Sequence, residues 1–279
     1  MKENHTKILK NYRNDWYNSD FLELIAKRIN LNQNSNALDV GCGKFHWSSI
    51  LSQYLKGINA ITGIDINPIN SNELLEIKKD KFQDDITLKF IEGNSNNLPF
   101  KDNTFDFVTC QTLLIHIENP ITSIKEMYRV LKNNGKILIS EPNNLSQTIF
   151  RNSLNINDNI KKRISVIKDK MISERRKIQK NNGDNSIGEI IPLFLDKVGF
   201  KNIDCFINDK IIKLAPPYES KEEFEKIDML SKLIENYPFN FSNIEKTQIR
   251  KVLAAISDNK FVSYNPTMLF LSIGEKIID

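Results

Sequence analysis

The fold of this chain is decided by residues 37–47, which read ALDVGCGKFHW. The first residues are apolar and typical of a buried strand, whereas the spacing of apolar residues over 46–56 predicts a helix. Gly41 and Gly43 lie between the two, where a glycine turn lets the backbone approach a ligand closely. A dinucleotide fingerprint needs a third glycine, but His46 stands in that place. The turn should therefore hold a pyrophosphate poorly.

Strand-like and helical segments alternate on both sides of this turn. Strands are expected at 36–41, 60–65, 88–92, 105–110, 136–141, 201–207 and 267–274, and helices at 46–56, 70–80, 120–132, 160–178, 186–198, 220–235 and 242–256. The alternation and the short connections in the first half predict an α/β fold with a parallel sheet wound on both faces. The second strand ends at Asp65, whose carboxylate can accept hydrogen bonds from both hydroxyls of a ribose. An adenosine ligand without a pyrophosphate therefore suits this site better than NAD.

The composition is that of an ordinary globular protein, with 279 residues, 40% hydrophobic and 27% charged. It excludes collagen-like, low-complexity and wholly disordered chains. The three cysteines are far apart and form no C-x-x-C pair, so we expect reduced thiols, no disulfide framework and no metal site. The polar start and the lack of a long apolar run lead us to expect a soluble, cytoplasmic protein with no membrane partner.

One segment is strongly basic. Residues 161–180 hold nine Lys and Arg against two acidic residues, a net +7; because the whole chain carries +4, the remainder carries −3. A stripe of apolar residues from Ile160 to Ile178 recurs at helical spacing, and we expect it to pack on the core with the basic side chains outward. Three readings of the basic side remain open: a solvated face, a contact with an anionic small substrate or partner, and a contact with nucleic acid.

Four motifs in order resemble those of class I S-adenosylmethionine-dependent methyltransferases. They are LDVGCGKF at 38–45, GIDINP at 63–68, EGNSNNLPFKDNTFDFVTCQTLLIHI at 92–117 and RVLKNNGKILISEPNN at 129–144. The resemblance covers about residues 20–144 and 186–210. It departs from the family pattern at Phe45, where the last glycine of the first motif is expected, and at Asn94, where an aspartate is common.

The resemblance implies a Rossmann-like, seven-stranded, mostly parallel sheet with helices on both faces and helical insertions that form a cap over the substrate side. The implied organisation is an N-terminal helical segment at 1–35, a core at 36–144, 186–210 and 266–279, and cap insertions at 145–185 and 211–265. S-adenosylmethionine is the implied cofactor.

The resemblance also assigns the cofactor-binding residues, which are Asp39, Gly41, Cys42, Gly43, Asp65, Ile66, Asn94, Ser95 and Gln111. By this assignment Asp39 orients the turn and the methionyl amino group, and Asp65 holds the ribose hydroxyls. Asn94 and Ser95 face the adenine, and Gln111 lies beside the methionyl end.

Methyl transfer needs an aligned acceptor and, for a hydroxyl or a protonated amine, a base. His116 and Glu141 follow the fourth and fifth strands and are the candidates. The alternative for His116 is a structural role at a helix start, and for Glu141 it is a hydrogen bond to a loop. The substrate-binding candidates are Tyr12, Tyr17, Asn143 and Tyr218.

The sequence thus predicts a methyltransferase, either a monomer or a homodimer, that modifies an oxygen or nitrogen of a small molecule in an enclosed pocket. Two alternatives remain. One is a tRNA or rRNA methyltransferase that uses the basic helix at 161–180, although nucleic acid is not the expected partner. The other is a protein that binds S-adenosylmethionine without catalysis.

Overall fold

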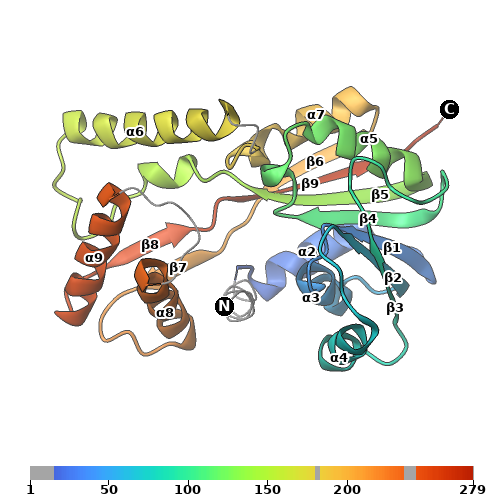
Figure 1. Ribbon diagram of the computed structural model, residues 1–279, viewed down its shortest axis with the longest axis horizontal. Coiled ribbons are helices and arrows are strands. Elements are labelled where there is room, and N and C mark those ends of the chain that lie inside the picture. The colour runs from blue at the N-terminus through green and yellow to red at the C-terminus, as the bar shows by residue number, and fades with distance from the viewer. Residues whose placement is uncertain (1–15, 180–182, 236–242, 279) are drawn as a thin grey trace. The chain divides into compact units, whose positions relative to one another are not determined.

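The computed structural model describes residues 16–179, 183–235 and 243–278 (Figure 1). The chain divides into two units. The sheet unit comprises residues 19–146, 170–208 and 268–279, and the insertion unit comprises residues 1–18, 147–169 and 209–267. Each unit is described by itself.

A seven-stranded sheet forms the centre of the sheet unit. Its strands, in order across the sheet, are β3 (Thr87–Glu92), β2 (Ile58–Asp65), β1 (Ser35–Val40), β4 (Phe105–Gln111), β5 (Leu131–Pro142), β9 (Leu269–Glu275) and β6 (Lys201–Ile207). The strands from β3 to β5 pair in parallel, whereas β9 runs antiparallel to both β5 and β6. This order brings the ends of β1 and β2, and of β4 and β5, to one edge of the sheet, where ligands bind in wound α/β folds.

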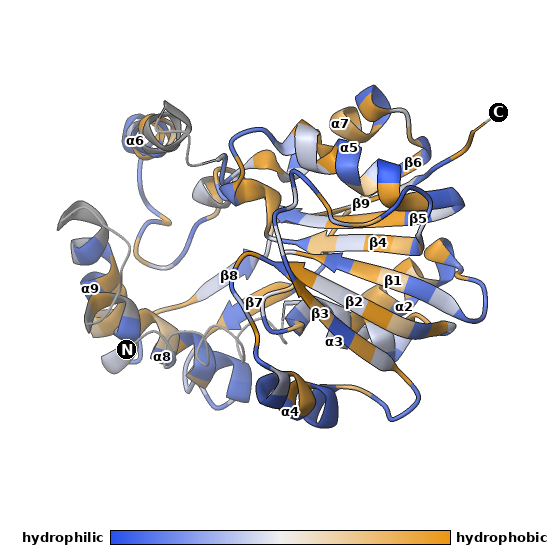
Figure 2. Ribbon diagram, turned by 45° about the vertical axis from the view of Figure 1, so that its right-hand side comes forward, coloured by the Kyte–Doolittle hydropathy of each residue, from blue (hydrophilic) through white to orange (hydrophobic). Residues whose placement is uncertain are grey.

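Helices cover both faces of this sheet (Figure 2). They are α2 (Ser19–Ile29), α3 (His46–Tyr54), α4 (Ser71–Lys81), α5 (Pro120–Val130) and α7 (Ile191–Val198), with the short 3₁₀ turns η1 (Leu114–His116) and η3 (Ile187–Ile190). Helices α2 and α3 lie on one face, and α5 and α7 lie on the other. The predicted doubly wound, seven-stranded architecture is therefore confirmed.

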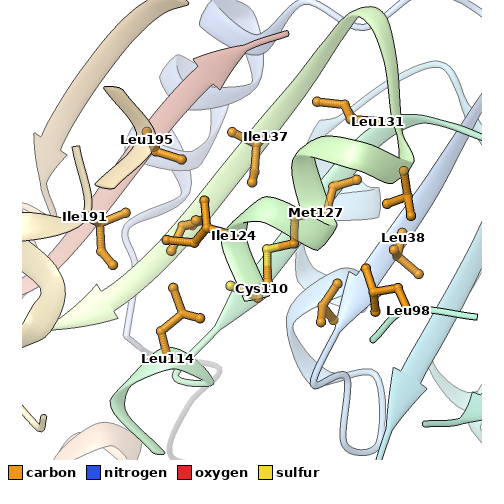
Figure 3. Close-up of a cluster of buried hydrophobic side chains, with 14 of the residues drawn as sticks. Leu38, Leu98, Cys110, Leu114, Ile124, Met127, Leu131, Ile137, Ile191 and Leu195 are labelled. Carbon is orange, nitrogen blue, oxygen red and sulfur yellow. The ribbon is translucent and has the colours of Figure 1, made fainter. Parts of the chain in front are cut away.

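The main core lies between the sheet and helices α5 and α7. Figure 3 shows its centre, built from Cys110, Ile124, Met127, Ile137, Ile191 and Leu195. All six side chains are buried to the point of having no exposed surface. Strands covered on both faces are apolar along most of their length, which is why β1, β4 and β5 could be recognised as short apolar runs.

A buried lysine just after β9 binds the turn that precedes β4, the last turn of α5 and the first residue of β5. Lys276 is almost fully buried, and its Nζ donates hydrogen bonds to Oδ1 of Asn103 at 2.9 Å, to the Tyr128 carbonyl at 2.9 Å and to the Leu131 carbonyl at 2.7 Å. Several hydrogen bonds to one buried cation offset the cost of taking the charge out of water.

The insertion unit combines helices with a small sheet that the sequence did not predict. Its elements are η2 (Ser146–Ile149), the first half of α6 (Ile160–Gln179), β7 (Ile211–Leu214), α8 (Lys221–Glu235), α9 (Asn243–Ser257) and β8 (Ser263–Pro266). Strands β7 and β8 pair antiparallel. Each is only four residues long, too short to show an alternating pattern, so the expected helices are present but the small sheet beside them was missed.

Helix α8 begins at the predicted capping box. The Ser220 hydroxyl accepts from the Glu223 amide at 3.2 Å, and the Glu223 carboxylate accepts from the Ser220 amide at 3.1 Å. The second predicted box, at Ser242, lies outside the described residues. The role of the two insertions as a cap over the substrate remains a prediction.

Over the side chains that the structure describes, Ile160 to Met171, the apolar stripe of the basic helix does not pack on a core. Helix α6 exposes 65% of Ile160, 57% of Ile164 and 54% of Met171. The expectation that this stripe is buried was therefore wrong. Helical periodicity shows that apolar residues share a face, but it cannot show that another element covers that face.

Within residues 16–179, 183–235 and 243–278, no helix combines the length and the apolar character needed to cross a membrane.

Candidate functional site

The glycine turn after β1 is fixed by the neighbouring strand. The amide of Gly41 donates to the Ile64 carbonyl at 2.8 Å, and the amide of Gly43 donates to Oδ2 of Asp65 at 2.9 Å. Both glycines have positive φ, +70° and +49°, a conformation that other residues adopt only at a cost. A Cβ at Gly43 would have no described atom within 4 Å, so the backbone there is open to a ligand.

Phe45 takes the left-handed conformation that the missing motif glycine would adopt. Its φ and ψ are 56° and 35°, which costs a non-glycine residue about 1–2 kcal/mol. The ring is completely buried and makes edge-to-face contacts with Phe82 and Phe90, at centroid distances of 6.2 and 6.5 Å. It also lies against Gly63, where an added Cβ would come within 2.4 Å of the ring. Burial of the ring offsets the backbone cost, so the turn forms without the glycine.

Asp39, at the end of β1, is a buried acid that lacks strong donors. Its exposed fraction is 1%, and no described residue gives either carboxylate oxygen a hydrogen bond of normal geometry. Burial raises its pKa from the usual 3.8 to about 7, although the hydroxyl and amide of nearby Ser48 lower it in part. Such a carboxylate would gain strongly from a cationic or hydrogen-bond-donating ligand.

Asp65 ends β2 beside the turn and is held in place by backbone and side-chain donors. Besides Gly43, the amide and Nδ2 of Asn67 donate to its Oδ1, each at 2.9 Å. The next residue, Ile66, exposes 68% of its side chain, which leaves an apolar surface next to a carboxylate. Sequence reasoning did not single out Asn67, although an Asn two residues after an Asp is a common turn-forming pattern.

Cys42 lies inside the same turn and is buried. Burial, together with the charges of Asp39 and Asp65, raises the pKa of its thiol far above the usual value. The thiol is therefore protonated at neutral pH and fills space rather than acting as a nucleophile.

The segment after β3 ties itself to α5. Oδ1 of Asn94 accepts from the Asn96 amide at 2.9 Å. The hydroxyl of Ser95 lies 3.0 Å from that of Ser123, which in turn donates to Oδ1 of Asn96 at 2.6 Å. The Ser95 hydroxyl thus bonds within the protein, and Asn94 remains exposed. Their predicted contact with a ligand base stays a prediction.

Glu141, at the carboxyl end of β5, is fully buried and holds η1. Its Oε1 accepts from the amides of Leu113 and Leu114, at 2.8 and 2.7 Å. The side chain of Leu113 in turn lies over Gly41, where an added Cβ would come within 2.7 Å of it. Glu141 therefore couples the end of β5 to the glycine turn through η1.

His116 is the last residue of η1 and is exposed. A second contact fixes its position. The backbone of Gly183 packs against the Ile115–His116 peptide so closely that a Cβ on residue 183 would not fit. Gln111 is the last residue of β4, just before η1, and its side chain is buried. The catalytic role of His116 and the ligand contact of Gln111 remain predictions.

The predicted substrate residues divide between the units. Asn143 belongs to the sheet unit, where its amide donates to the Met268 carbonyl at 2.9 Å and its side chain bonds to Glu189 and Ser146. Tyr17 and Tyr218 are buried in the insertion unit.

The hydroxyl of Tyr218 donates to the Phe261 carbonyl at 2.8 Å and accepts from the Phe261 amide at 3.1 Å, so it has a structural role within that unit. Tyr12 lies outside the described residues. For all four predicted substrate residues, binding of a substrate stays a prediction.

Comparison with known proteins places this geometry in context. Residues 38–139 match the family model described as a methyltransferase domain. Among curated proteins, the demethylmenaquinone methyltransferase of Staphylococcus saprophyticus is 33% identical over 127 residues, which cover 46% of this chain and 53% of that protein. The corresponding enzyme of a Geobacillus species is 35% identical, with coverage of 45% and 53%. The match thus spans about half the length of these relatives.

Solved structures share the fold at low identity. The [4+2]-cyclase SpnF is 16% identical with a TM-score of 0.57, and the match covers 98% of this chain and 93% of that one. A protein from Bacillus halodurans, provisionally assigned as a methyltransferase, is 19% identical with a TM-score of 0.51 and coverage of 92% and 99%. These similarities concern the fold alone.

Proposed function

We propose that the protein is an S-adenosylmethionine-dependent methyltransferase with a small-molecule acceptor, because residues 38–139 match the family model of a methyltransferase domain. The observation that carries this proposal is the arrangement at the ends of β1 and β2. An open glycine turn, a buried acid without strong donors and an acid next to an exposed apolar residue lie within one segment of the sheet edge.

These residues fit the cofactor in charge and in shape. Asp65 would accept from the ribose hydroxyls, and the exposed side chain of Ile66 would lie against the adenine. Asp39 would receive the methionyl amino group, directly or through a water molecule. Two carboxylates in a partly buried site also suit a ligand that carries positive charge, because opposite charges attract more strongly away from bulk water.

When bound, S-adenosylmethionine supplies a methyl group that is already strongly electrophilic, because it is attached to a positively charged sulfur. The chain then has to align the acceptor and exclude water. His116, exposed at the end of η1, would take a proton from a hydroxyl or an ammonium acceptor. Glu141 would keep η1, and thereby His116, in place through the amides of Leu113 and Leu114.

A small-molecule acceptor, methylated on oxygen or nitrogen, is supported by the curated relatives, whose name gives demethylmenaquinone as their substrate. RNA is less well supported, because α6 exposes a stripe of aliphatic side chains that phosphates cannot satisfy. A role without methyl transfer is the second alternative, since a protein of the same fold bears the name of a cyclase.

Calorimetric titration tests cofactor binding. The protein should bind S-adenosylmethionine and S-adenosylhomocysteine but not NAD, and Asp65→Ala should weaken binding by about 1–3 kcal/mol, the usual cost of lost charge-assisted hydrogen bonds. Asp85→Ala, an exposed aspartate after α4, is the matched control. Tight NAD binding, or an unaltered affinity in Asp65→Ala, would contradict the proposal.

Turnover separates the enzyme from the alternatives. Production of S-adenosylhomocysteine is measured with phenols, hydroquinones and amines on one side and bulk tRNA on the other. Methylation of a small acceptor supports the proposal, methylation of tRNA alone supports the RNA alternative, and binding without turnover on either panel supports a role outside catalysis.

A further inference from the structure

Helix α6 presents an apolar stripe that no described element covers. The α6 face, as we call it, consists of Ile160, Ile164, Ile167 and Met171, spaced by four, three and four residues. Three of these side chains are more than half exposed, and Ile167 is half-buried. At about 100° of rotation per residue, the four lie within a narrow band along the helix.

The segment that leads into α6 extends this apolar surface. Ile149, Leu154 and Ile156 expose about half of their side chains. Arg163 in the first turn of α6 donates to the Ile149 carbonyl at 3.2 Å, so this segment lies beside the start of the helix. All of these residues belong to the insertion unit.

Basic residues border the α6 face on both sides. The same rotation places Lys161 and Lys168 along one edge of the stripe and Arg163 and Lys170 along the other. The sequence of α6 contains eight Lys and Arg against two acidic residues, a net +6. A complementary partner would have a negatively charged surface that contacts the basic borders and an apolar layer beneath it that receives the aliphatic band.

We propose that α6 binds peripherally to a lipid bilayer that contains anionic lipids, with its axis in the plane of the headgroups. The aliphatic band would enter the acyl boundary, and the basic borders would contact the headgroups. This goes beyond the proposed methyl transfer and does not depend on it. It replaces the expectation of no membrane partner, which rested on the lack of a long apolar run and so concerned spanning segments alone.

Other partners match the α6 face less well. Nucleic acid would satisfy the basic borders but not the aliphatic band, and the face has no aromatic residue for base stacking. A second copy of α6 would bring basic borders against basic borders. A groove on an acidic protein would be expected to receive an aromatic anchor, and this face has none.

Flotation of the full chain with vesicles tests the proposal. Vesicles of phosphatidylcholine with about one third phosphatidylglycerol should carry the protein with them at low salt, vesicles of phosphatidylcholine alone should not, and added salt should weaken the binding. Ile164→Asp should abolish binding. Replacing Lys161, Lys168 and Lys170, which border the stripe, by Gln should weaken it about 100-fold, at about fivefold for each charge lost near an anionic surface.

A matched control removes the same charge elsewhere. Lys27, Lys79 and Lys101 are exposed on the sheet unit, and their replacement by Gln should leave vesicle binding unaltered. Hydrogen exchange adds a local readout, because amides over 160–172 should exchange more slowly on anionic vesicles. Circular dichroism and thermal unfolding verify that each variant is folded, and a separate titration with the cofactor distinguishes failure here from failure of the proposed function.

Several results would overturn the inference. They are equal binding to neutral and anionic vesicles, an Ile164→Asp variant that floats like the wild type, and a control triple that loses binding as fully as the α6 triple. Tight binding to tRNA without vesicle binding would assign the face to nucleic acid. Self-association that Ile164→Asp removes would assign it to a second copy, and failure to float on either vesicle would exclude the bilayer.

Discussion

Asp39→Asn should stabilise the fold at alkaline pH, because the wild-type acid is buried without strong donors. The pKa of Asp39 rises from the usual 3.8 to about 7, so the folded protein holds a proton that the unfolded chain has already released over this range. A rise of about three pH units corresponds to about 4 kcal/mol. Stability from this group is complete below pH 4 and is lost as the pH rises to 7. Asn cannot ionise and should avoid that loss.

Thermal unfolding at pH 4, 6 and 8, without ligand, measures the effect. The variant and the wild type should be nearly equal at pH 4, and the variant should unfold on the order of 10 °C higher at pH 8, given about 2–4 °C per kcal/mol for a unit of this size. Asp85→Asn, which replaces an exposed aspartate, should change nothing at any pH. An Asp39→Asn protein that is no more stable than the wild type at pH 8 would refute the reasoning.

The same variant connects stability to the proposed cofactor. A positively charged amino group prefers the ionised acid, so the affinity of the wild type should fall about tenfold between pH 8 and pH 6, as about nine tenths of Asp39 becomes protonated. Asp39→Asn should bind more weakly at pH 8 and show less of this pH dependence. Calorimetry at both pH values checks it, and a steeper dependence in the variant would contradict the assignment. The acid then trades stability for binding, as functional sites often do.

Three further substitutions test other parts of the sheet unit. His116→Ala should lower turnover by about 10²–10⁴-fold and leave cofactor affinity nearly unchanged if His116 is the base, whereas a lower melting temperature with turnover retained would favour a structural role. Glu141→Ala should destabilise the fold by about 2–4 kcal/mol, because the buried amide of Leu114 and the partly buried amide of Leu113 lose their acceptor; urea unfolding measures this, and a change below about 0.5 kcal/mol would contradict it. Lys276→Met should cost a similar amount, since the buried Leu131 carbonyl and the partly buried oxygens of Asn103 and Tyr128 lose their donor, and an unaltered urea midpoint would show that the packing compensates.

Much of the sheet unit could be predicted, because its strands are buried on both faces and are separated by turn residues. The strand β6 (Lys201–Ile207) has the bounds that the sequence indicated. The acid at the end of β2 and the glycines before α3 were found for the same reason, since local patterns mark them.

What the sequence could not supply depends on tertiary surroundings. The donors of Leu113 and Leu114 reach Glu141 across nearly thirty residues, and no local pattern indicates such a bond. The pKa of Asp39 depends on complete burial. The exposure of α6 depends on which elements fail to cover it, and periodicity carries no information about that.

The contact between Phe45 and Gly63 means that substitutions at these two positions depend on each other. A phenylalanine at 45 is tolerated because position 63 has no side chain, and the ring leaves no space for even one methyl group there. Neither residue can therefore change alone without loss: Phe45→Gly would empty a buried space, and Gly63→Ala would collide with the ring. Across related sequences we expect the two positions to covary, with glycine at 45 accompanied by a larger residue at 63. A pattern search that demands the third motif glycine would miss every chain in which this exchange has occurred.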